Sequence, residues 1–99
     1  MQTIVPKITR LTIDSREVAR MMSKSHSHLL RDLEIFSNYL GESKIGFSDF
    51  WQKSSYKTEQ NKILKCYLIT KKGCEFLAHK MTGKKGVIFT ATYINKFHE

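Results

Sequence analysis

Residues 14–41 read DSREVARMMSKSHSHLLRDLEIFSNYLG, and their pattern predicts two helices joined by a short turn. Asp14 or Ser15 suits the N-cap of the first helix, and Glu17 follows Asp14 at the spacing of a capping box. We expect this helix to end near residues 23–25, because the two serines there favour turn geometry over a helix interior.

The second helix is the most clearly marked one in the chain. It is expected to begin near Ser25 or His26 and to end at Gly41, a natural C-terminal stop. Four apolar residues recur at the spacing of one helical face and predict its buried side: Leu29, Leu33, Phe36 and Leu40. At about 100° per residue, the opposite side carries Ser27, Arg31, Glu34 and Asn38, with His28 on one flank.

Strands are predicted on both sides of this helix pair. Before it, near-alternate apolar residues favour a short strand that stops at Asp14: Ile8, Leu11 and Ile13. After it, residues 50–58 and 63–70 predict two strands, and the polar residues 59–62 form the turn between them. These two strands therefore make a β-hairpin.

Two more helices are predicted at the C-terminal end. Thr70 can cap a helix that ends at Gly83 and has apolar residues at helical spacing: Cys74, Leu77, Ala78 and Met81. The last helix carries an aromatic stripe that packs on the domain or joins two copies, with core packing preferred: Phe89, Tyr93 and Phe97.

This order of elements predicts an α+β fold, a winged helix-turn-helix-like domain of helices plus one β-hairpin wing. Residues 15–40 would form the helix-turn-helix and residues 50–70 the wing. In such domains the second helix enters the major groove of DNA, while the first helix braces it across the phosphate backbone. Ser23 and Lys24 depart from the common turn pattern, which has glycine followed by an apolar residue.

Length and charge narrow the class of protein. The 99 residues suffice for one domain, with residues 1–7 as a loose N-terminal arm, and the chain carries a formal charge of +8. Residues 1–50 hold seven basic side chains against six acidic ones, whereas residues 51–99 hold ten lysines against three glutamates. A polyanionic partner, nucleic acid, is therefore expected. Membrane insertion is not expected, because no stretch approaches about 20 apolar residues.

Double-stranded DNA is the expected partner, with the start of the second helix as the reading end. Arg31 can present a bidentate fork to guanine, and Ser27 or His28 can bond base edges or phosphates. The residues expected to contact DNA are Arg16, Lys24, Ser25, His26, Ser27, His28, Arg31, Lys53, Lys57, Lys62, Lys84 and Lys85.

Several of these residues also have a structural interpretation. Arg31 stands next to Asp32 and suits a surface ion pair, which contributes little to stability. His26 can cap its helix or fold onto the first helix, and this role is preferred to DNA contact. The hairpin lysines can equally serve to discourage association between strand edges.

The sequence gives little support to an enzyme or a metal site. His26 and His28 point about 200° apart on a regular helix, so they cannot hold one ion together. Cys66 and Cys74 lie in apolar runs without an activating motif and are expected as reduced core residues. Residues 83–86, GKKG, lack the pattern of a phosphate-binding loop and are interpreted as a turn between helices. No catalytic residue, metal or cofactor is expected.

Short motifs spread over residues 14–97 resemble a known family. They are SREVA at 15–19, Lys24, His26, LRD at 30–32, Tyr56, CYLITK at 66–71, Gly73, TGKK at 82–85, YI at 93–94 and Phe97. Their order and spacing resemble the Rha family of bacteriophage and prophage regulatory proteins. The resemblance implies a phage-encoded regulator in the cytoplasm of a bacterial host, with a winged-helix-like DNA-binding module. Many relatives continue into a separate C-terminal domain.

Two functions remain open at this point. The first is a regulator that binds double-stranded DNA through the helix-turn-helix and the basic hairpin, either as a monomer or as a homodimer that matches two half-sites. The alternative is a protein-interaction module, antirepressor-like, that binds a repressor or another phage or host regulatory protein. RNA binding is a weaker option. Proteins that read single strands usually stack the bases on exposed aromatic side chains, whereas Trp51, Tyr56 and Tyr67 can equally belong to the core.

Overall fold

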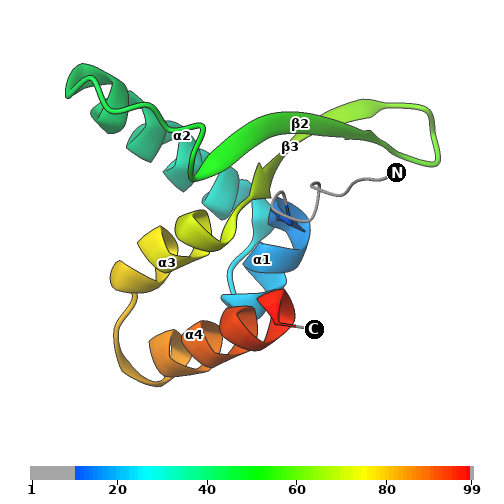
Figure 1. Cartoon of the computed structure of the whole chain (residues 1–99). Coiled ribbons are helices and arrows are strands. Elements are labelled where there is room, and N and C mark those ends of the chain that lie inside the picture. The colour runs from blue at the N-terminus through cyan, green and yellow to red at the C-terminus, as the bar shows by residue number, and fades with distance from the viewer. Residues whose placement is uncertain (1–10, 99) are drawn as a thin grey trace, which may run out of the picture.

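The structure, a computed structural model, describes residues 11–98. Within them the chain forms, in order, β1 (Ile13–Asp14), α1 (Ser15–Met21), α2 (His26–Glu42), β2 (Trp51–Lys57), β3 (Ile63–Ile69), α3 (Lys71–His79) and α4 (Gly83–Phe97). These helices and one antiparallel sheet make an α+β fold, as predicted (Figure 1). The expected arm at residues 1–7 and Ile8 of the first predicted strand lie outside the described residues.

The sheet has the strand order β1-β3-β2, and neighbouring strands are antiparallel. β2 and β3 pair along their whole length, from Trp51 opposite Ile69 to Lys57 opposite Ile63. β1 pairs with the other edge of β3, where Ile13 also lies opposite Ile69. Because α1 and α2 stand between β1 and β2 in sequence, this arrangement is compatible with a winged helix.

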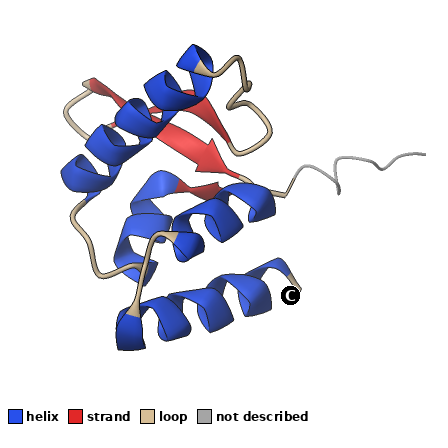
Figure 2. Ribbon diagram, turned by 90° about the vertical axis from the view of Figure 1, so that its left-hand side faces the viewer, coloured by secondary structure: helices blue, strands red, loops and turns tan. Residues whose placement is uncertain are grey.

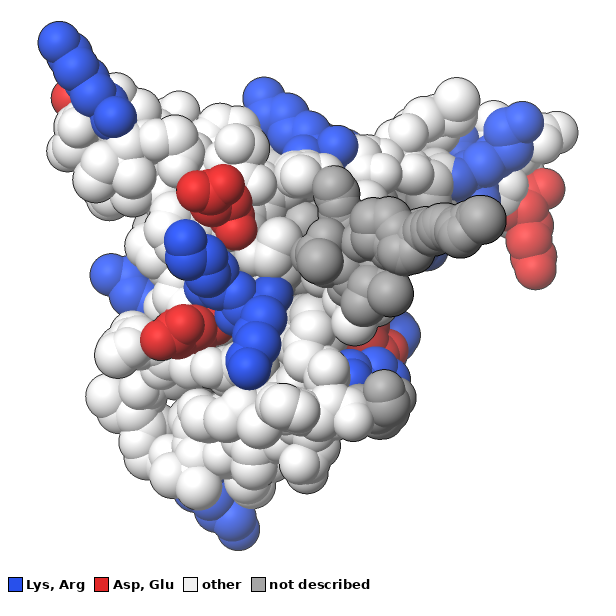
Figure 3. Space-filling model, viewed as in Figure 1, with Lys and Arg blue, Asp and Glu red and all other residues white. Residues whose placement is uncertain are grey.

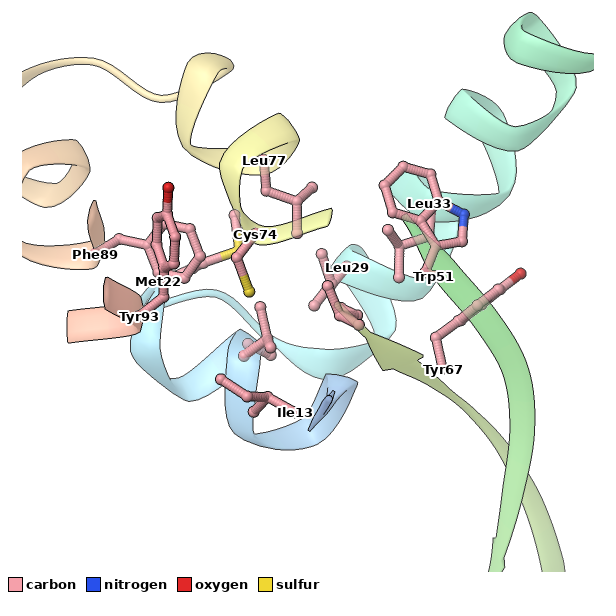
Figure 4. Close-up of a cluster of buried hydrophobic side chains, with 13 residues drawn as sticks. Ile13, Met22, Leu29, Leu33, Trp51, Tyr67, Cys74, Leu77, Phe89 and Tyr93 are labelled. Carbon is pink, nitrogen blue, oxygen red and sulfur yellow. The ribbon is translucent and has the colours of Figure 1, made fainter. Parts of the chain in front are cut away.

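One cluster of buried side chains joins the helices to the sheet (Figure 4). Leu29 and Leu33 of α2 are fully buried in it, as their spacing predicted. Phe89 and Tyr93 of α4 are buried in the same cluster, and their ring centroids are 5.4 Å apart. The aromatic stripe of the last helix therefore packs in the core, which was the preferred interpretation.

The turn between α1 and α2 is a Schellman motif without glycine. The N–H of Ser23 donates to the carbonyl of Arg20 at 3.0 Å, and the N–H of Lys24 donates to the carbonyl of Ala19 at 2.9 Å. Ser23 has a φ of 57°, in the left-handed region that glycine favours. The serine thus adopts the conformation for which helix-turn-helix proteins often use glycine, and it turns the chain into α2. Figure 2 shows α2 lying across the strands of the hairpin.

Glycine is required where α3 meets the end of the hairpin. Thr70 caps α3 by accepting the N–H of Gly73 at 3.1 Å, and its hydroxyl donates to the carbonyl of Asp49 at 2.8 Å. A Cβ atom on Gly73 would lie 2.0 Å from the carbonyl oxygen of Phe50. The close approach of α3 to the chain before β2 therefore requires glycine, which has no side chain, at position 73.

Three local predictions are corrected by the structure. Asp14 caps α1 by accepting the N–H of Arg16, but Glu17 hydrogen bonds to Arg20 instead of completing a capping box. α3 ends at His79, because i→i+3 hydrogen bonds close the chain there, so Met81 follows the helix. Residues 83–86 form the first turn of α4, and residues 80–82 together with the positive φ of Gly83, 72°, connect it to α3.

Candidate nucleic-acid interface

The outer side of α2 is open to solvent, as its sequence pattern predicted. Leu29 and Leu33 are fully buried on the inner side, whereas Ser27, His28 and Arg31 are exposed. The exposed stripe continues through Glu34 and Asn38 to the second half of the helix. Ser25, the N-cap, accepts the N–H of His28 at 3.2 Å and so defines where the helix begins.

His26, the first residue of α2, is tied to α1 and to the sheet. Its Nε2 atom lies 2.8 Å from the hydroxyl oxygen of Ser15, which also accepts the N–H of Tyr67 at 2.9 Å. Ser15 is fully buried. Burial lowers the pKa of His26 below its ordinary value, although the nearby Asp14 carboxylate favours protonation. His26 therefore has the structural role that was preferred from the sequence.

Ion pairs hold most of the lysine and arginine side chains of α1, α2 and the turn between them. Arg16 donates to both carboxylate oxygens of Asp14 at 3.0 Å, and these bonds lower the pKa of Asp14. The other pairs are Arg20 with Glu17, and Lys24 with Asp32 at 2.7 Å. Arg31 forms no ion pair with any residue between 11 and 98, since Asp32 is bound to Lys24.

The hairpin carries lysines of both strands on one of its faces. Side chains alternate along β2, so Lys53 and Lys57 point to the same face, and the pairing register places Lys65 of β3 on that face. Tyr56 points to the opposite face, where the guanidinium of Arg16 lies 3.7 Å from its ring centroid. Lys53, Lys57 and Lys65 are therefore brought together, whereas Arg16 lies behind them.

The basic face of the hairpin borders the outer side of α2. Glu34 and Asn38 of α2, with Lys53 and Tyr67 of the hairpin, line a shallow hollow of about 300 Å³. Across it, Lys65 Nζ lies 3.7 Å from Glu34 Oε2, a distance typical of a weak, exposed ion pair. We call this surface the α2–hairpin face: Ser27, His28, Arg31, Glu34, Asn38, Lys53, Lys57 and Lys65.

Buried aromatic contacts fix the position of α2 relative to the hairpin. The indole N–H of Trp51, at the start of β2, donates to the hydroxyl of Ser37 in α2 at 2.9 Å. Phe76 of α3 lies beneath this junction, with its ring centroid 5.3 Å from Trp51 and 5.6 Å from Phe36. The two halves of the α2–hairpin face are therefore held by the core rather than by their own charges.

Other predicted contact residues are not gathered on this face. Lys24 is ion-paired, and Lys62 lies exposed in the turn at the tip of the hairpin. Lys84 and Lys85 lie in the first turn of α4, which Figure 1 shows at the opposite end of the molecule from the hairpin. Lys65 was not among the predicted contacts, although strand alternation counted back from the hairpin turn would have placed it beside Lys53.

On the face of the molecule seen in Figure 3, the basic side chains do not form one continuous patch. Lysine and arginine groups are instead scattered over the hairpin, the region of α3 and the far end of α2.

Other chemistry is limited in the described residues. Burial raises the pKa of Cys74 to about 12 and also raises the pKa of Cys66, so both thiols stay protonated at neutral pH. Within residues 11–98, no three histidine, cysteine, aspartate or glutamate side chains are close enough to share a metal ion. None of the four helices described there is both long and apolar enough to span a bilayer.

Comparison with known proteins places the chain in a family. Residues 13–99 match the phage regulatory protein Rha family. The chain is also 42% identical, over 97 residues, to the "SPbeta prophage-derived putative antirepressor protein YoqD" of Bacillus subtilis (strain 168). That match covers 98% of this chain and 39% of the relative, so the chain spans about two fifths of its length. No solved structure matches significantly. The chain therefore belongs to the phage regulatory protein Rha family.

Proposed function

We propose that this phage regulatory protein binds double-stranded DNA through the α2–hairpin face, in the cytoplasm of a bacterial host. The observation that carries the proposal is the state of Arg31. It is exposed on the outer side of α2 and forms no ion pair with a described residue, whereas Arg16, Arg20 and Lys24 do. Arginine in this position can present two N–H groups to guanine in the major groove.

The hairpin supports the same proposal. Lys53 and Lys57 are exposed on the face that borders α2, so a duplex lying along α2 would meet their ammonium groups at its phosphates. Lysines that neutralise phosphates release counterions, which makes the affinity fall as salt rises. In this proposal, Arg31 reads the bases and the lysines bind the phosphates.

The carboxylate on this face restricts how DNA can approach. Glu34 would repel phosphates, yet it lies 3.7 Å from Lys65, which offsets its charge. Its position one turn after Arg31 suits an acceptor for the amino group of cytosine. We expect the duplex to contact the first half of α2 most closely, from Ser27 to Arg31.

The test begins with duplexes selected from a random pool. Their affinity and that of a scrambled duplex are measured by fluorescence anisotropy between about 50 and 200 mM salt. Arg31→Ala should reduce the ratio of the two affinities by about tenfold or more, since a bidentate arginine–guanine pair is worth about 1–3 kcal/mol. Lys57→Ala should weaken both duplexes alike and lower the salt slope by about 1.

A matched control is Lys96→Ala, which removes one exposed lysine from the last turn of α4. It should leave the affinity ratio and the salt slope nearly unchanged. An unchanged affinity ratio in Arg31→Ala would show that α2 does not read the bases. No duplex preference by the wild-type chain would contradict the proposal as a whole.

A second candidate function is favoured by the relative that is described as an antirepressor. In that case the chain would bind a repressor or another regulatory protein, and its affinity for DNA would stay at the non-specific level. Size-exclusion chromatography with a purified phage repressor distinguishes the two. A stoichiometric complex, together with no selected duplex, would favour the antirepressor-like function.

A further inference from the structure

Two polar side chains on the outer side of α2 point in almost the same direction. Arg31 and Asn38 are seven residues apart, and at about 100° per residue their directions differ by only about 20°. Both residues are exposed, whereas Leu29 and Leu33 on the inner side are fully buried. Arg31 and Asn38 therefore lie on the line of α2 that faces directly away from the core.

The carboxylate between these two residues is turned toward the hairpin. Glu34 lies about 60° from Arg31 around the helix axis, on the side of Ser37, which accepts the indole N–H of Trp51. The Oε2 atom of Glu34 is 3.7 Å from Lys65 Nζ. The negative charge of Glu34 is therefore at the flank of α2, and the outermost line is left to the guanidinium and the amide.

The amide of Asn38 is not used by the fold. It forms no hydrogen bond with another group between residues 11 and 98, so its N–H donors and its carbonyl acceptor are both available to a partner. Asn38 also borders the hollow that Lys53 lines. A phosphate bound by Lys53 would therefore keep a duplex within reach of this amide.

A guanidinium and an amide match different bases in the major groove. Arginine donates two N–H groups to O6 and N7 of guanine, whereas asparagine accepts from N6 and donates to N7 of adenine. Arg31 and Asn38 are about 10.5 Å apart along the helix axis, and successive base pairs are about 3.4 Å apart. The two side chains can therefore reach bases that are two or three base pairs apart.

We infer that Asn38 is a second base-reading residue, and that the preferred duplex carries an adenine two or three base pairs from the guanine that Arg31 contacts. Because α2 must lie in the major groove for this, the inference rests on the proposed function. Asn38 lies beyond the segment of α2 that is expected to approach the duplex most closely. It would contact the far end of the reading site, where Lys53 holds the phosphates.

Selected duplexes with single base-pair replacements test the two residues separately. For the wild-type chain, fluorescence anisotropy should show about tenfold weaker binding when either the guanine or the adenine is replaced, since each bidentate contact discriminates by at least about that factor. Asn38→Ala should bind all four base pairs at the adenine position with affinities within about twofold of one another, and should still prefer the guanine. Arg31→Ala should show the reverse pattern.

The matched control is Asn95→Ala, which removes an exposed asparagine from α4, outside the α2–hairpin face. This variant should keep the preference for both bases. Circular dichroism should show the same fold in all three variants, since the replaced side chains are exposed.

The failure of this inference differs from the failure of the proposed function. If the wild-type chain enriches no duplex, both fail. If a guanine preference depends on Arg31 but Asn38→Ala relaxes no position, only the role of Asn38 is overturned. Equal weakening of every duplex by Asn38→Ala would also overturn it, because that pattern indicates a phosphate contact.

Discussion

The helix pair and the hairpin use their basic side chains in opposite ways. In α1 and the turn that follows it, the cations Arg16, Arg20 and Lys24 are bound by carboxylates of the helix pair or of the residue before it. On the hairpin, Lys53 and Lys57 form no ion pair with any residue between 11 and 98. The paired charges of the helix pair therefore contribute to the structure, while Arg31 of α2 and these two hairpin lysines are available to a partner. Substitutions of the ion-paired residues should change stability, and substitutions of Lys53 or Lys57 should change salt-dependent binding.

The largest effect is expected from Ser15→Ala. The substitution removes the buried hydroxyl that accepts the N–H of Tyr67 and contacts His26. An unpaired buried donor costs about 1–3 kcal/mol, so the free energy of unfolding should fall by about 2 kcal/mol in urea denaturation. Ser55→Ala, an exposed serine of β2, should change it by less than about 0.5 kcal/mol. Equal effects of the two substitutions would remove the contrast between the regions.

The ion pair of Lys24 with Asp32 should have a smaller effect. Both side chains are about one third exposed, and a double-mutant cycle of Lys24→Ala and Asp32→Ala should give a coupling of about 0.5–1 kcal/mol. Lys53→Ala, by comparison, should leave stability unchanged and weaken duplex binding at low salt. A coupling of zero in the cycle would mean that the ion pair of Lys24 with Asp32 has no structural role.

A stabilising substitution is expected at Ser23. Its φ of 57° lies in the left-handed region, which costs a non-glycine residue about 1–2 kcal/mol, whereas glycine has greater entropy to lose on folding. Ser23→Gly should therefore raise the free energy of unfolding by about 0.5 kcal/mol, measured as a higher urea midpoint. A lower midpoint would show that the serine side chain contributes something beyond the turn conformation.

The smallest effect should be a shallow pH dependence from His26. Burial lowers its pKa in the folded chain, so the unfolded chain binds a proton more readily and stability falls as pH drops below about 6.5. His26→Gln removes this titration, and urea midpoints measured at about pH 7.5 and about pH 5.5 should then differ less than in the wild type. The converse result, a steeper dependence in the variant, would contradict the assignment to His26.

Much of the helix pair could be predicted from local signals. The apolar spacing of Leu29, Leu33 and Phe36 defined the buried side of α2, and capping residues marked where α1 and α2 begin. The hairpin was visible because two strand-like runs enclose a polar turn. These features depend on residues close in sequence, so a single sequence is enough to predict them.

The ion-pair network could not be predicted in the same way. Asp32 stands next to Arg31 in sequence, but it pairs with Lys24 because the turn at Ser23 folds residue 24 back toward α2. The contact of Ser15 with Tyr67 spans 52 residues, and no local pattern reports it. The exposed apolar residues of α4 were not predicted, because the aromatic stripe already explained why this 15-residue helix is apolar.

The single tryptophan of the chain has a consequence for experiments. Trp51 is fully buried and its indole N–H is bonded to Ser37, so its fluorescence emission reports whether α2 stays on the hairpin. A shift of that emission to longer wavelength on adding a ligand would mean that water has entered the junction, whereas a constant wavelength would mean that the two elements move as one body. The unlabelled protein thus carries its own optical sensor of rigidity.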